Sequence, residues 1–107
     1  MAELLFIGND MSLTVTGLKD EIAGTFINSG ATVTATIKNR AGVNVSGQNW
    51  PLTLSYLTGT NGNYRGVLED GIAFEANEIY RIEITADAGS DVIGFWRYER
   101  KAVYRTP

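Results

Sequence analysis

The chain has 107 residues, of which 44% are hydrophobic and 20% are charged. These values are typical of a globular domain, and the length leaves room for a single core, so a wholly disordered chain is excluded. The chain contains neither cysteine nor histidine. Disulfides, thiolate catalysis, the commonest metal ligand and the usual general base are therefore excluded. We expect one non-enzymatic domain over residues 1–107, with no cofactor.

The N-terminal segment holds the longest apolar block of the chain. Leu4-Leu5-Phe6-Ile7 is far shorter than the roughly 20 residues that a membrane helix requires. Glu3 precedes this block and no basic region does, so we expect neither a membrane span nor a signal peptide. Two interpretations of residues 1–9 remain open. They are a first strand of the domain's own sheet, or an arm that adds to the sheet of a neighbouring subunit.

The segments that follow alternate apolar and polar residues with a period of two, which is typical of half-buried β-strands. The clearest is Ala31–Lys38, where alanine, valine and isoleucine share one face and three threonines occupy the other. The same alternation predicts strands at residues 12–17, 52–58, 63–69, 79–86 and 92–104. No segment shows the periodicity of an amphipathic helix, although residues 70–77 have room for one short turn.

Turn-forming residues between these segments predict hairpins. Asn61-Gly62 tolerates the positive φ angles of a tight turn, so residues 52–58 and 63–69 should pair antiparallel. Asp87–Asp91 predicts a second hairpin, which joins residues 79–86 to the strand that starts at Val92.

Strands that recur about every 8 to 12 residues predict an all-β fold, an antiparallel immunoglobulin-like β-sandwich of about seven or eight strands. In such a fold we expect Trp50 or Trp96 to fill the space between the sheets, because large aromatic residues of small domains are usually core. Tyr80 opens a strand after an acidic corner, and we expect it to brace that corner.

Acidic residues are the main candidates for chemistry. Glu69, Asp70, Glu75 and Glu78 are close in sequence. However, glycoside hydrolysis requires two carboxyls about 5 to 10 Å apart across a cleft, and short loops leave little room for one. We therefore expect no catalytic residue.

Metal and phosphate sites are also not expected. Asp87, Asp91, Asp70 and Asn63 offer the hard oxygen ligands that calcium takes. Their spacing differs from that of an EF-hand loop, and acidic turn residues commonly support the turn itself. The Gly59–Gly62 segment lacks the Lys-Ser/Thr pair that a phosphate-binding loop requires.

The net charge of −3 is unevenly distributed. From Arg97 onward there are four cations and one anion, a charge of +3, whereas the first 96 residues carry five cations and eleven anions, a charge of −6. Cations interleaved with tyrosines can follow a nucleic-acid backbone, but the acidic body would repel a polyanion. We therefore expect no nucleic-acid partner and instead a contact with an acidic protein surface.

Strand and turn motifs follow one another along nearly the whole chain: Gly8–Met11 before an LxVxGL strand, Gly24–Asn28 before an AxVxAxIK strand, Gly47–Leu52, Asn61–Gly66, Tyr80–Ala86 and a last strand through Arg97. This order resembles small immunoglobulin-like structural proteins of tailed bacteriophages. The resemblance implies a non-enzymatic particle component, either a capsid decoration protein or a head–tail or tail accessory. It implies a virion location after synthesis in the host cytoplasm, and no functional residue.

We therefore expect docking on other virion subunits, and possibly on further copies of the same chain, within a symmetric assembly. The expected contact residues are an apolar group and a cationic group: Leu4, Leu5, Phe6 and Ile7, with Arg97, Arg100, Lys101 and Arg105. The alternative is a carbohydrate- or metal-binding β-sandwich that uses the loops around Asn61–Tyr64 and Asp87–Asp91.

Overall fold

The computed structural model describes residues 4–20, 24–88 and 91–105. These residues form nine β-strands: β1 (Leu4–Phe6), β2 (Met11–Val15), β3 (Lys19–Asp20), β4 (Thr25–Phe26), β5 (Thr32–Lys38), β6 (Leu52–Tyr56), β7 (Tyr64–Leu68), β8 (Ile79–Ala88) and β9 (Asp91–Val103). The prediction of an all-β fold is confirmed. Within these ranges, no helix has the length and apolar character needed to cross a membrane.

Seven of the strands form one mixed sheet in the order β1-β9-β8-β5-β6-β7-β2, and β3 pairs with β4 in a small separate hairpin. Neighbours in the large sheet are antiparallel, except that β1 runs parallel to β9 with Leu5 opposite Ala102. The prediction of a wholly antiparallel fold is wrong at this pair. Almost the entire chain separates β1 from β9, so no tight turn imposes an antiparallel direction on them.

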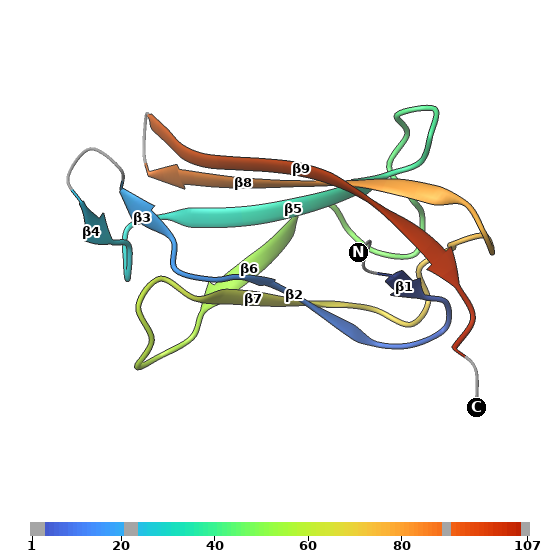
Figure 1. The fold of residues 1–107 in the computed structure, drawn as a ribbon, viewed down its shortest axis with the longest axis horizontal. Coiled ribbons are helices and arrows are strands. Elements are labelled where there is room, and N and C mark those ends of the chain that lie inside the picture. Colours follow the sequence, from blue (N-terminus) through green and yellow to red (C-terminus); the bar gives the residue numbers. More distant parts are fainter. Residues whose placement is uncertain (1–3, 21–23, 89–90, 106–107) are drawn as a thin grey trace.

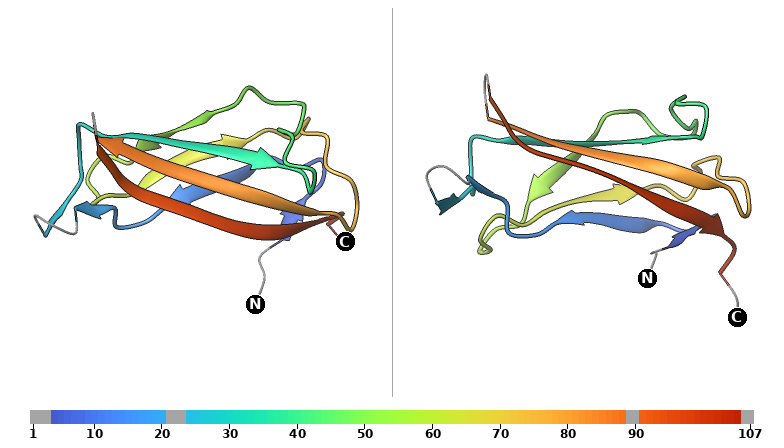
Figure 2. Two further views of the ribbon diagram at one scale, coloured as in Figure 1. Left: turned by 90° about the horizontal axis from the view of Figure 1, so that it is seen from above. Right: turned by 45° about the horizontal axis from the view of Figure 1, so that its top comes forward.

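The large sheet curls into two layers and nearly closes into a barrel (Figures 1 and 2). Strand β6 makes the passage between the layers. Its first residues pair with β5, with Leu54 opposite Val33, and its last residues pair with β7, with Tyr56 opposite Tyr64. As a result β9, β8 and β5 lie in one layer, β7 and β2 lie in the other, and β2 and β9 face each other across the remaining gap (Figure 1).

The core lies between the two layers and follows the predicted alternation. Along β5, Val33, Ala35 and Ile37 are fully buried, and Ile82 on β8 joins them. The expectation for the tryptophans is wrong for Trp96, which is 38% exposed, and Trp50 packs only at the periphery of the core. The aromatic residues inside the core are Tyr64, Phe74 and Tyr80.

The predicted hairpins form. Strands β6 and β7 pair antiparallel, but through a loop longer than two residues, in which the Leu57 N–H donates to the Asn63 carbonyl. Strands β8 and β9 form the second hairpin, whose residues 89–90 lie outside the described ranges. A register shift at Ala86/Asp87 marks a bulge near the start of β9.

Tyr80 braces the corner before β8, as predicted. Its hydroxyl accepts a hydrogen bond from the Glu75 N–H at 2.7 Å, and its ring packs edge-on against Phe74 with 4.9 Å between centroids.

Candidate functional site: the seam between β2 and β9

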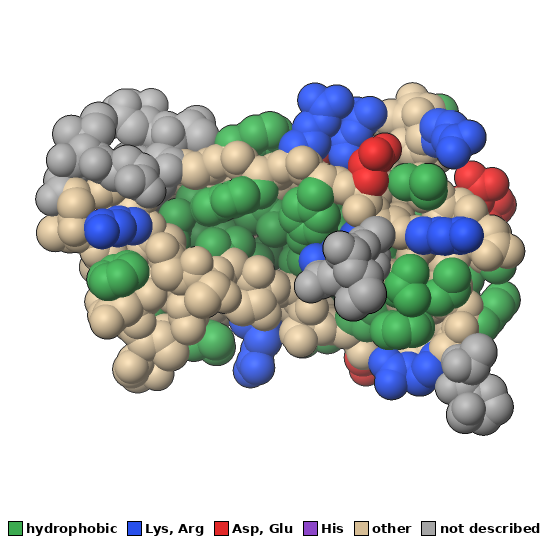
Figure 3. All heavy atoms as spheres, in the orientation of Figure 1, with side chains coloured by type: hydrophobic (Ala, Val, Ile, Leu, Met, Phe, Trp, Pro, Cys, Tyr) green, Lys and Arg blue, Asp and Glu red, His purple; other side chains and the backbone are tan. Residues whose placement is uncertain are grey.

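The gap in the curled sheet between β2 and β9 is the most distinctive surface feature of the described residues, and we call it the seam. It contains a hollow of about 300 Å³. The lining comes from strands β2, β8 and β9 and from Thr16, the residue after β2: Thr14, Val15, Thr16, Ile84, Trp96, Tyr98 and Arg100. In the space-filling view, hydrophobic side chains fill the floor of this hollow between the two bounding strands (Figure 3).

Both strands that border the seam present a backbone edge to it. Among the described residues, the ladder of β2 is formed with β7 alone, and the ladder of β9 over Asp91–Arg97 is formed with β8 alone. Strand β1 takes the outer edge of β9 only from Lys101 onward. Exposed strand edges are templates for pairing with another chain unless they are covered or blocked.

The floor of the seam is apolar and aromatic. Ile84 is 3% exposed, and the register places Trp96 directly opposite it on β9. The Trp96 ring lies back over Gly94, where a Cβ atom would come within 2.6 Å of the indole. The missing side chain at Gly94 therefore lets the indole lie flat along the strand. Phe95 points to the other face of β9 and is 56% exposed.

The four predicted contact cations do not form one patch. Arg100 lines the seam, with its guanidinium 4.8 Å from the Tyr98 ring, and the Arg105 guanidinium lies 4.5 Å from the Phe6 ring. Arg97 and Lys101 are exposed on β9. The alternation of side chains along a strand accounts for this separation.

The outer face of β8 and β9 carries a small charge network centred on Glu83. The Glu83 carboxylate lies 2.9 Å from Lys38 Nζ and 3.9 Å from Arg97 Nε. The hydrogen bond from Lys38 lowers the pKa of Glu83 below its ordinary value. Because Lys38 makes the shorter contact, the Arg97 guanidinium, whose side chain is 55% exposed, is held only loosely.

The described part of the apolar N-terminal block forms the chain's own first strand. Leu5 is buried in the core, whereas Leu4 is 41% exposed. Phe6 and Ile7 are half-buried, and the Ile7 N–H donates to the Val103 carbonyl. Residues 1–3 of the predicted arm lie outside the described ranges. The contact role of Leu4–Ile7 stays a prediction. The Leu5 side chain is buried, so in this arrangement it cannot contact a partner.

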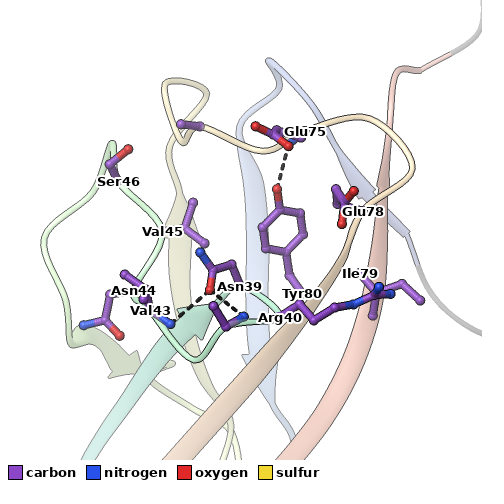
Figure 4. Close-up of a pocket in the computed structure, with 12 residues that line it drawn as sticks. Asn39, Arg40, Val43, Asn44, Val45, Ser46, Glu75, Glu78, Ile79 and Tyr80 are labelled. Atoms are coloured by element: carbon purple, nitrogen blue, oxygen red, sulfur yellow. Dashed lines mark hydrogen bonds between the residues drawn. The ribbon is translucent and has the colours of Figure 1, made fainter.

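A second hollow of about 660 Å³ lies between the loop after β5 and the segment before β8 (Figure 4). Glu75, Glu78 and Arg40 line it, and Asn39 accepts hydrogen bonds from the Ala41 and Val43 N–H groups. Glu75 and Glu78 are both exposed. Exposed carboxylates such as these do not form the buried acid pair that hydrolysis requires.

The carboxylates that lie together differ from the residues that the sequence offered as calcium ligands. Three exposed carboxylates from different segments, Asp10, Glu69 and Asp70, bring oxygens within 4.8 Å of one another. The proposed ligand Asn63 instead accepts a hydrogen bond from the Gly17 N–H. Asp87 is not in the acidic group, and the side chain of Asp91 lies outside what the structure describes. Exposed acidic groups are common without an ion, so this trio alone defines no site.

No family model, curated protein or solved structure matches the chain. The candidate site is therefore defined by its geometry alone.

Sequence reasoning singled out the strand that carries half of the seam but missed the seam itself. The signal was the mixture of aromatic and cationic residues on both faces of residues 92–104, which predicts that something covers one of these faces. Thr14 and Thr16 carried no comparable signal. Polar residues on a strand look the same whether they face open solvent or a gap in the sheet.

Proposed function

We propose that this chain is a non-enzymatic interaction protein that docks on other protein subunits by adding a strand of the partner at the seam. The observation that carries the proposal is the pair of strand edges, on β2 and β9, that border one apolar hollow. Main-chain hydrogen bonds to such edges supply affinity, and pockets for alternate side chains supply specificity.

The resemblance to phage structural proteins supports a subunit role within a virion, as a capsid decoration or a head–tail or tail accessory protein. In this proposal the nearly closed sheet is a variant of the immunoglobulin-like sandwich. The exposed part of the termini, including Leu4, Lys101 and Arg105, adds contacts beside the seam. Each contact can be weak, because many equivalent contacts in a symmetric assembly sum through avidity.

A peptide-display selection against the immobilised full chain tests this function. Random peptides should be enriched for binders, and these should lose binding when Trp96→Ala removes the floor of the seam. Thr60→Ala, in the β6–β7 loop and outside the seam lining, is the matched control and should leave binding unchanged. Binders that ignore Trp96→Ala would count against the proposal.

The rival proposal is a carbohydrate- or metal-binding module that uses the loops around Asn61–Tyr64 and Asp87–Asp91. Binding of calcium or a sugar to the folded state raises the melting temperature by linkage. A clear rise with either ligand, without any peptide that requires Trp96, would favour this rival.

A further inference from the structure

The two strands that border the seam restrict what can occupy it. It is bounded on one side by the edge of β2 and on the other by the edge of β9, and both belong to the same curled sheet (Figure 1). The edge of a second folded sheet would bring its own neighbouring strand against one of these borders. A single extended segment meets no such obstacle and can pair on either side.

The floor of the seam defines the chemistry of one face of that segment. Strands in register share their inward and outward positions, so a residue opposite Trp96 points toward Ile84 and the core. The lining there is apolar and aromatic, and leaving a polar side chain unpaired in it would cost free energy. Apolar side chains therefore suit the inward positions.

The outer face of β9 defines the chemistry of the outward positions of the bound segment. The next position along the strand is Arg97, whose half-exposed guanidinium has its carboxylate contact at 3.9 Å, on a Glu83 that already binds Lys38. An acidic residue opposite Arg97 would supply a closer counter-charge.

Strand β1 shows that the outer edge of β9 accepts a parallel strand. It pairs with Lys101, Ala102 and Val103, at the end of the same edge. The regular part of the edge begins at Gly94, after the bulge, and runs toward this existing ladder. An occupant that continues the line of β1 would extend an interface already present in the fold.

We propose that the seam binds an extended segment of another protein chain in which apolar and acidic residues alternate, with the apolar residues over Trp96 and Ile84 and an acid opposite Arg97. This inference rests on the proposed function and adds the chemistry of the partner.

The probes are three synthetic peptides of about eight residues, a common strand length. One alternates valine and glutamate, one alternates valine and lysine, and one has the first composition with all valines before all glutamates. Titration into the full wild-type chain should show binding of the first peptide at least about tenfold tighter than either of the others, because only it matches both faces.

Variants of the chain locate the binding. Trp96→Ala should weaken the alternating valine–glutamate peptide by about tenfold or more, as expected when an aromatic anchor is lost. Arg97→Gln should weaken it about threefold, the scale of an exposed ion pair. Arg40→Gln removes an exposed arginine outside the seam lining and should change nothing. Amide hydrogen exchange on the wild-type chain, which needs no variant to fold, should show new protection on β2 and β9.

Equal binding of the lysine peptide or of the blocked peptide would overturn the inference, as would protection elsewhere than β2 and β9. A different outcome would refute the proposed function. Selected peptides that require Trp96 but lack alternation or acids would leave that function standing and refute this inference. Selected peptides of which none requires Trp96 would refute both.

Discussion

The centre of the large sheet and the seam are built from the same alternating strands but end in different states. At the centre, β5 pairs with β8 over seven residues, and Val33, Ile37 and Ile82 are completely buried. Along β9, Trp96 in the floor of the seam is 38% exposed, and Phe95 on the opposite face of the strand is 56% exposed. The difference is in the neighbours, because β5 and β8 have a strand on both sides, whereas β1 pairs with β9 only from Lys101 onward. The alternation of apolar and polar residues therefore predicts a strand, and the absence of a neighbouring strand leaves an edge that can bind a partner.

This contrast separates stability from interaction. Burial at the centre supplies the apolar contacts that hold the fold, whereas exposed apolar groups at the seam contribute less to folding and remain available to a partner. Substitutions at the two places should therefore have opposite profiles: at the centre they reduce stability, and at the seam they reduce binding.

The largest expected effect is at the centre. Ile82→Ala should lower the free energy of unfolding by about 4 kcal/mol, because the side chain is fully buried and the packed sheet cannot collapse around the cavity. Phe95→Ala, on the exposed face of β9, should lower it by about 1 kcal/mol. Urea denaturation of both variants measures the two values. Equal losses would show that the exposed face of β9 contributes to folding as much as the centre of the sheet does.

A second large effect is expected where the β6–β7 loop supports the segment after β2. Gly62 has a φ of 73°, and a Cβ atom there would lie 2.4 Å from the Leu18 carbonyl oxygen. Gly62→Ala should cost about 2 kcal/mol or more, because the backbone must move and strain the Leu18 N–H to Gly62 carbonyl hydrogen bond.

Gly59→Ala is the control for that experiment, because Gly59 also has a positive φ but an added Cβ would meet nothing within 4 Å. Gly59→Ala therefore measures the cost of the positive φ angle alone, without the steric cost of the contact with Leu18. If the two variants melt at the same temperature, the contact with Leu18 contributes nothing.

Tyr80→Phe should have a smaller effect. The ring and its contact with Phe74 remain, but the Glu75 N–H loses its acceptor, which should cost about 1 kcal/mol. Thermal unfolding of Tyr80→Phe beside Tyr104→Phe, whose side chain is exposed, gives the comparison. An unchanged melting temperature in the first variant would mean that water replaces the hydroxyl at no cost.

The local fold was largely readable from the sequence, because alternation and turn chemistry act over a few residues. Ala31–Lys38 predicted a strand with a buried aliphatic face, and β5 has one. The parallel pairing of β1 with β9 was not readable, because it depends on where the two chain ends meet in space. The exposure of Trp96 depends in the same way on an absent neighbour, so residue type alone predicted it to be core.

The candidate site was less predictable than the fold for the same physical reason. The four cations from Arg97 to Arg105 are one cluster in sequence, but strand alternation and the chain end send them to different surroundings. The acidic trio shows the reverse case, since Asp10 lies about sixty positions from Glu69 and Asp70 and joins them only through the pairing of Met11 with Leu68. Neither arrangement can be predicted without knowing the order of the strands in the sheet.

The smallest expected effect tests the charge network on the outer face of the sheet. The Lys38 hydrogen bond holds the pKa of Glu83 below its ordinary value of 4.5. A carboxyl with a lowered pKa in the folded state stabilises the fold above the unfolded-state pKa, and this stabilisation is lost as the pH falls through the lower folded-state pKa. Lys38→Gln should therefore cost about 0.5 kcal/mol near pH 7, and that difference from wild type should shrink as the pH falls below 4.5.

Arg97→Gln in the same titration sharpens the contrast between centre and edge. Lys38 lies on β5, 2.9 Å from Glu83, whereas Arg97 lies on the bordering strand at 3.9 Å. Its removal should change the pH dependence of the free energy of unfolding less than removal of Lys38 does, because Coulomb energy and hydrogen bonding both weaken with distance. A larger change for Arg97→Gln would mean that Glu83 already neutralises Arg97. The acid on an incoming strand would then have no charge to meet at that position.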